Sequence, residues 1–147
     1  MARKAKSRKP PLEQFKIKVT ATAVTIGHRA PGLSPLHPNG HADSDIKIEG
    51  ALDRPVLNRG TAIVCVFCGA DVGDTPGGAI GATTAWQVGL YLPREQFADL
   101  LIIVAARRLG EVDLQLEGLR RGKGAVRSAS FQTELVPCER NHDIDDA

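Results

Sequence analysis

The stretch EVDLQLEGLRRGKGAVRSASFQTEL, residues 111–135, decides the fold class of this chain. From Glu111 to Glu117, apolar residues alternate with charged or amide residues, which is the period of two that a half-exposed β-strand shows. Ala125 to Leu135 alternates in the same way. Between them, Arg120 to Gly124 contains glycines and cations and is typical of a turn. The sequence therefore predicts a β-hairpin in this part of the chain.

Strand character recurs upstream of the hairpin. Residues 15–23 are apolar at odd positions with Lys or Thr between them, and residues 46–52 also alternate until Asp53–Pro55 ends the pattern. Residues 61–68 are apolar at odd and even positions and rich in β-branched residues, which predicts a strand buried on both faces. Residues 84–92 place apolar side chains at even positions. Together with the hairpin, these segments predict about six strands.

One α-helix is expected between the fourth and fifth of these strands, over approximately residues 93–108. Pro93 suits the first position of a helix, where its missing N–H costs nothing. Apolar residues from Phe97 to Val104 recur at the spacing of one helix face, and Gly110 supplies a left-handed stop.

These elements predict a mainly-β protein, with α+β as the alternative class. The expected architecture is an antiparallel β-sandwich, or a sheet whose end or face is closed by the helix. Glycine and proline crowd His28–Asp43 and Gly69–Gly81, which we expect to be long loops. We expect a flexible basic arm at residues 1–12, a single β-rich domain at 13–137 and an acidic C-terminal tail at 138–147.

Composition limits the class of protein further. A chain of 147 residues with 42% hydrophobic residues is long enough for one buried core without disulfides. Apolar runs fall short of the ~20 residues that a membrane-spanning helix needs, and the N-terminus lacks the apolar stretch of a signal peptide. An odd number of cysteines fits a reducing compartment. We therefore expect a cytoplasmic protein with no membrane partner.

The C-x-x-C-G motif is the most specific polar pattern, and with a C-x-x-x-H near the C-terminus it suggests a zinc site. The candidate ligands are Cys65, Cys68, Cys138 and His142. Against this site, a regular strand would point side chains three residues apart to opposite faces, leaving the thiols as small apolar groups. A less favoured metal candidate is the first long loop, with His28, His37, His41, Asp43 and Asp45.

Cations gather in two places that could contact a nucleic-acid backbone. The candidates are Arg3, Lys4, Lys6, Arg8 and Lys9 in the arm, and Arg120, Arg121, Lys123 and Arg127 around the hairpin turn. Such contacts would be independent of base sequence. Aromatic residues are not interleaved with these cations, and the one expected helix commits its apolar face to the core, so neither a stacking platform nor a recognition helix is predicted.

Motifs of nucleophilic catalysis and phosphate binding, such as G-x-S-x-G and G-K-[ST], are missing, so the sequence disfavours an enzyme without settling the matter. The leading hypothesis is a non-enzymatic binding or assembly module that uses strand edges, long loops and the arm to engage a protein partner or its own copies. The alternatives are a nucleic-acid-associated protein and a small zinc-binding protein or enzyme. Apart from zinc, no cofactor is expected.

Overall fold

The computed structural model describes residues 11–31, 41–69 and 76–135. The described residues form seven strands and one helix, which confirms the mainly-β class. In chain order the elements are β1 (Leu12–Arg29), β2 (His41–Val56), β3 (Arg59–Cys68), β4 (Gly77–Ala82), β5 (Trp86–Leu92), α1 (Arg94–Ala105), β6 (Leu109–Arg120) and β7 (Lys123–Thr133).

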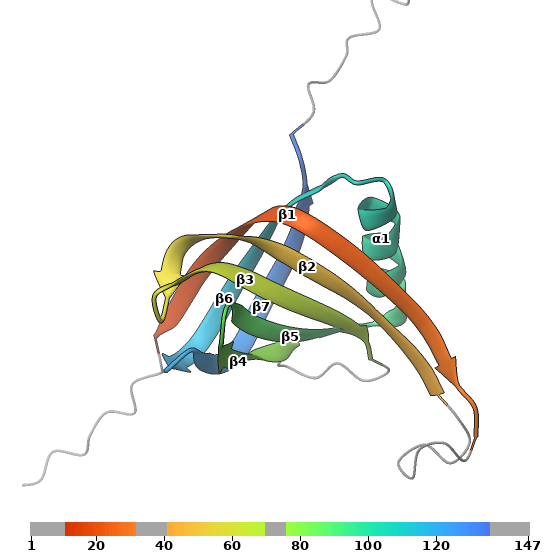
Figure 1. Cartoon of the computed structure of the whole chain (residues 1–147), viewed down its shortest axis with the longest axis horizontal. Coiled ribbons are helices and arrows are strands. Elements are labelled where there is room, and N and C mark those ends of the chain that lie inside the picture. The colour runs from red at the N-terminus through yellow and green to blue at the C-terminus, as the bar shows by residue number, and fades with distance from the viewer. Residues whose placement is uncertain (1–10, 32–40, 70–75, 136–147) are drawn as a thin grey trace, which may run out of the picture.

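The strands form a closed barrel in the order β1-β2-β3-β5-β4-β7-β6, and the pairing of β6 with β1 closes it (Figure 1). The prediction of a sandwich was therefore wrong. Alternating apolar and polar residues give a strand one buried face in either architecture, so the pattern does not report whether a sheet closes on itself. Closure depends on pairs such as Leu12 with Glu117, which lie far apart in the sequence. The pairings are antiparallel except that between β3 and β5, which is parallel.

Inward-facing side chains from the strands of the barrel fill its interior. The largest fully buried ones are Trp86, Ile17, Ile46, Ile48, Leu90, Leu114, Leu116, Val64, Val66, Val88, Val112 and Val126. Helix α1 lies at one end of the barrel and buries Phe97, Leu100 and Val104 against this core (Figure 1). Within the part of the chain that the structure describes, no helix is long and apolar enough to cross a membrane.

The helix prediction is confirmed, with a shorter span and a different stop. Helix α1 ends at Ala105, and Arg107 takes the left-handed conformation, at φ 56°, that we expected of Gly110. Gly110 instead belongs to β6, where a Cβ would lie 2.8 Å from Cγ of Glu134. The close passage of the chain after β7 thus explains this glycine better than a helix stop does.

Strand β4 lies in a stretch that we predicted to be a loop. Its glycines permit a close approach between strands, because a Cβ on Gly77 would lie 1.9 Å from the carbonyl oxygen of Gly89 in β5. Glycine usually weakens a strand but is suited to such a position. The missed strand also changes the place of the helix, which lies between the fifth and sixth strands.

The predicted bounds of the first loop, His28–Asp43, were wrong at both ends. Strand β1 continues to Arg29 and β2 already begins at His41, so the two strands pair as a long hairpin. A β-bulge at Thr20 shifts the register, and β1 pairs with β6 only up to Lys18. Beyond the bulge, β1 continues beside β2 without β6 on its other side (Figure 1), and we call residues 21–29 and 41–49 the β1–β2 arm, of which residues 45–49 also pair with β3.

Strand β3 has one buried face, whereas both were predicted to be buried. Ala62, Val64 and Val66 point into the barrel and are fully buried. Their neighbours of the opposite parity are half-buried, and Phe67 contacts the ring of Tyr91, with centroids 5.4 Å apart. The apolar side chains on the outer face of β3 are thus only partly shielded from solvent.

Candidate nucleic-acid interface

Three connections between strands meet at one end of the barrel. They are the β2–β3 turn at Leu57, the β4–β5 connection that follows Ala82 and the β6–β7 turn at Gly122. A Cβ on Gly122 would lie 3.0 Å from Cδ1 of Leu57 and 3.7 Å from the backbone nitrogen of Ala82. Turns that are distant in the sequence are therefore packed against one another.

Both hairpin turns contain two residues with positive φ. Leu57 and Asn58 have φ of 49° and 63°, and Arg121 and Gly122 have φ of 52° and 77°. Two left-handed residues between paired strand ends are the mark of a type I′ turn, whose twist matches that of the strands. These turns are tight, so they carry their side chains directly over the end of the barrel.

Trp86 fixes the β6–β7 turn to the barrel. Its indole is fully buried, and Nε1 donates a hydrogen bond to the carbonyl oxygen of Gly122 at 2.9 Å. The indole also packs against Phe15, with ring centroids 4.9 Å apart, and the guanidinium of Arg54 lies 4.2 Å from the centroid of the Phe15 ring. The turn thus has a defined position relative to the first strand and the core.

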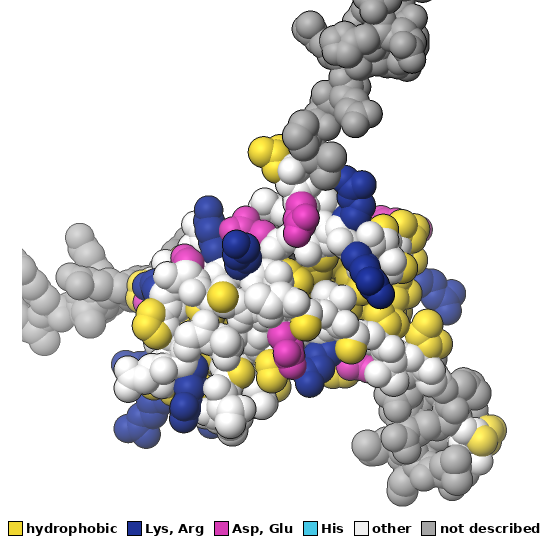
Figure 2. All heavy atoms as spheres, turned by 45° about the horizontal axis from the view of Figure 1, so that its top comes forward, with side chains coloured by type: hydrophobic (Ala, Val, Ile, Leu, Met, Phe, Trp, Pro, Cys, Tyr) yellow, Lys and Arg dark blue, Asp and Glu magenta, His cyan; other side chains and the backbone are white. Residues whose placement is uncertain are grey.

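Positive charge concentrates at this end. The side chains of Arg59, Arg120, Arg121 and Lys123 are exposed, and we call these four residues the basic end. The turn segments 57–60, 82–85 and 119–124 contain no Asp or Glu. Figure 2 shows Lys and Arg side chains gathered at the end of the molecule that carries these turns, at the lower left. Clustered like charges raise the local concentration of an oppositely charged ligand.

Two carboxylates on the strands that lead to these turns have partners of their own. Glu117 forms an ion pair with Arg127 on the neighbouring strand. Asp53 accepts a hydrogen bond from the backbone nitrogen of Lys16 at 3.1 Å. The ion pair offsets the charge of Glu117, and the turns at the basic end, which carry four cations and no carboxylate, retain a net positive charge.

The predicted basic residues divide into three groups. Arg120, Arg121 and Lys123 lie together at the turn, and Arg127 lies further along β7 beside Glu117. The candidates in the N-terminal basic arm, namely Arg3, Lys4, Lys6, Arg8 and Lys9, lie outside the described residues. Strand β1 nevertheless starts at this end of the barrel, because Leu12 pairs with Glu117. Sequence reasoning missed Arg59, whose only signal is its place after the Leu57-Asn58 turn.

The zinc candidates are not brought together in the described structure. Cys65 and Cys68 both belong to the regular strand β3, and their spacing of three sends their side chains to opposite faces. Cys65 is half-buried and Cys68 is exposed at the end of the strand. Cys138 and His142 lie outside the described residues. Among the residues that the structure describes, no group of three or more His, Cys, Asp or Glu side chains could hold a metal ion.

Two charged neighbours shift the pKa of Cys65 in opposite directions. Burial raises the pKa of the Cys65 thiol above its ordinary value of 9.0, the Asp45 carboxylate raises it further, and Lys47 lowers it in part. A thiolate is the form that binds metals and attacks electrophiles, so a raised pKa makes this thiol less reactive at neutral pH. In the other metal candidate, His28 and His41 lie on paired strands, and His37 lies outside the described residues.

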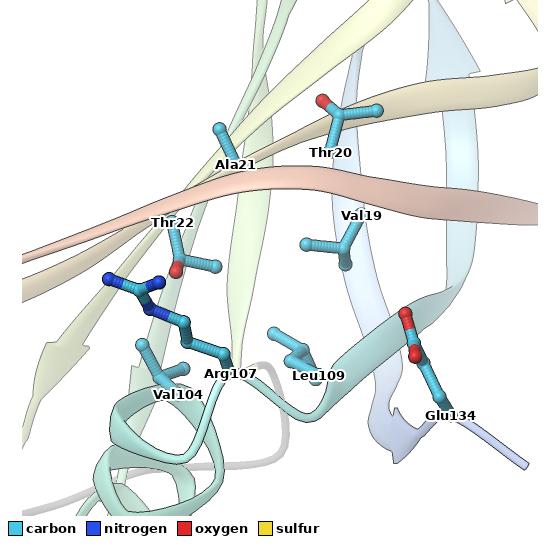
Figure 3. A pocket seen from close by; sticks show the side chains of 8 residues that line it. All are labelled: Val19, Thr20, Ala21, Thr22, Val104, Arg107, Leu109 and Glu134. Carbon is cyan, nitrogen blue, oxygen red and sulfur yellow. The ribbon is translucent and has the colours of Figure 1, made fainter. Parts of the chain in front are cut away.

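A cavity of about 380 Å³ lies on the other side of the molecule, beside the bulge in β1 (Figure 3). Its walls are residues 19–22 of β1, Val104 at the end of α1, Leu109 at the start of β6, and the side chains of Arg107 and Glu134. Figure 3 shows that Thr22 points from β1 toward Val104 and Arg107. The cavity separates β1 from the connection between α1 and β6.

Comparison with protein-family models, with curated proteins and with solved structures gives no match for this chain.

Proposed function

We propose that the protein is a non-enzymatic binding module whose basic end contacts the phosphate backbone of a nucleic acid. The observation that supports this proposal is the meeting of Arg59, Arg120, Arg121 and Lys123 on one end of the barrel, on turns without a carboxylate. The cations of residues 1–10 precede β1, which starts at the same end. Phosphate contacts of this kind account for most non-specific binding to nucleic acids.

The chemistry of the basic end favours phosphate over base contacts. Arginine guanidinium groups bind phosphate oxygens through paired hydrogen bonds, and three of the four cations are arginine. Stacking on bases requires exposed aromatic rings, but Trp86 and Phe15 at this end are buried. The expected ligand is therefore a nucleic acid bound with little dependence on its sequence.

A salt titration tests this proposal. The affinity for a fluorescently labelled single-stranded oligonucleotide would be measured by anisotropy at increasing salt, for the wild type and for a triple variant with Arg120→Gln, Arg121→Gln and Lys123→Gln. Each lost phosphate contact lowers the slope of log K against log salt by about 0.7 on single strands, so we expect the slope to fall by about 2. Affinity at low salt should fall as well.

A second triple variant provides the matched control. Arg94→Gln, Arg107→Gln and Arg108→Gln remove the same charge from exposed side chains at the ends of α1, away from the basic end. We expect this variant to keep most of the affinity and the slope of the wild type. Equal losses in both triple variants would mean that only net charge matters, and an unchanged slope in the first variant would refute the proposed interface.

A further inference from the structure

We propose that the outer edge of β1 in the β1–β2 arm pairs with the same edge of a second copy of this chain. The two strands would run antiparallel about a twofold axis that passes beside Val24, joining the two hairpins into one continuous sheet. This interface lies apart from the basic end. Strand β1 starts at the basic end, whereas the β1–β2 arm begins only after the bulge at Thr20.

The edge has no partner among the described residues. From Ala21 to Arg29, β1 pairs with β2 on one side, whereas its pairing with β6 on the other side stops at Lys18. The cavity beside residues 19–22 shows that no described element fills the space next to the first part of this edge (Figure 3). Unpaired N–H and C=O groups along an edge are a template for another strand.

The sequence of the edge lacks the usual protection. Residues 21–27, ATAVTIG, contain no charge and no proline, and β-branched residues make up much of the segment. Val24 and Ile26 are 40% and 76% exposed. Proteins normally protect free edges with lysine, proline, bulges or a covering loop. The bulge at Thr20 precedes this segment, so it bends β1 away from β6 but does not interrupt the free edge.

Self-pairing places complementary groups opposite each other. The pairing of β1 with β2 is regular from Ala21 to Arg29, so Thr22, Val24 and Ile26 share one face. With the axis at Val24, Ile26 of the second copy lies opposite Thr22 and on the same face. Thr22 points into the cavity, whose walls include Val104 and Leu109 as well as Arg107 and Glu134, so the exposed isoleucine of each copy would lie beside the apolar part of this lining in the other.

This complementarity is what favours a second copy over an unrelated strand. The same segment supplies both the free edge and an exposed isoleucine that would lie beside Val104 and Leu109 of the other copy, and symmetry makes the contact twice. An uncharged segment that runs antiparallel to itself also places no like charges opposite each other. A foreign strand would have to reproduce both features.

Sedimentation velocity over a roughly hundredfold range of concentration tests for the dimer. The variant Val24→Lys would place two lysines opposite each other at the axis, and like charges there oppose pairing. The matched control is Ile80→Lys, which adds the same charge at an exposed residue of β4, 63% accessible to solvent. We expect the wild type and Ile80→Lys to dimerise as concentration rises, and Val24→Lys to stay monomeric with an unchanged circular dichroism spectrum.

The register is tested by oxidation of engineered cysteines, with the three natural cysteines replaced by serine. A mixture of Thr22→Cys and Ile26→Cys chains should form a disulfide between the two variants, and Thr22→Cys alone should not. A wild type that remains monomeric throughout, a dimer that survives Val24→Lys, species larger than a dimer, or a disulfide in Thr22→Cys alone would each overturn the proposed pairing.

Discussion

Replacing Trp86 by Phe should measure how firmly the β6–β7 turn is held on the barrel. The substitution keeps an aromatic ring in the core but removes the Nε1–H that donates to the carbonyl oxygen of Gly122 at 2.9 Å. Because the indole is fully buried, water has little access to replace the lost donor. The perturbation thus combines a broken hydrogen bond with a small cavity in the packing next to Phe15.

The magnitude follows from these two effects. Leaving a buried acceptor without its donor costs about 1–3 kcal/mol, and a modest loss of core volume adds about 1 kcal/mol. We therefore expect the free energy of unfolding to fall by about 2–4 kcal/mol. For a domain of this size that loss lowers the midpoint of thermal unfolding by roughly 6–12 °C.

The assay is urea unfolding followed by circular dichroism, because Trp86 is the sole tryptophan and its fluorescence disappears with the substitution. The control is Tyr91→Phe, which also removes a polar group from an aromatic ring but at an exposed position. We expect the control to stay within about 0.5 kcal/mol of the wild type. A similarly small effect of Trp86→Phe would refute the reasoning, because it would mean that the hydrogen bond to Gly122 contributes little.

Further predictions concern the close approach of β4 to β5 and the thiol in β3. Gly77→Ala should destabilise the barrel by at least about 2 kcal/mol in the same urea assay, because its Cβ would lie 1.9 Å from the carbonyl oxygen of Gly89. Gly60→Ala, where a Cβ meets nothing within 4 Å, is the control and should change little. Asp45→Asn should lower the pKa of Cys65 and speed its alkylation at fixed pH, whereas Lys47→Gln should raise the pKa and slow it. Since the folded-state pKa is raised above 9.0, the contribution of Cys65 to stability should be lost as pH rises through that folded pKa, and Cys65→Ser should remove this loss.

The strands with clean alternation could be predicted from the sequence, and the close contacts between strands could not. Residues 111–120 and 123–133 form the predicted hairpin because a half-exposed strand needs nothing but its own alternation to be recognised. Strand β4 was not predicted, because the need for glycine at Gly77 comes from its close approach to Gly89, a residue of another strand. Barrel closure was not predicted for the same reason, since β1 and β6 are distant in the sequence and pair only in the folded structure.

The candidate interface was predicted in part. Arg120, Arg121 and Lys123 are neighbours in the sequence, so a hairpin turn alone is enough to bring them together. Arg59 is isolated among uncharged residues, and it joins them only because the β2–β3 turn packs against Gly122. The free edge of β1 was beyond sequence reasoning, because alternation does not reveal where β6 stops pairing at Lys18.

The closure of the barrel by β1 and β6 also sets a condition on how the chain folds. Leu12 leaves the ribosome well before its partner Glu117 is made, because the two residues lie far apart in the sequence. Contacts between such distant residues slow folding, since a long loop must be ordered before they form. During that interval β1 has an open edge along its whole length, including the uncharged segment 21–27. Synthesis rate and local chain concentration should therefore influence whether this strand first meets its own barrel or another chain.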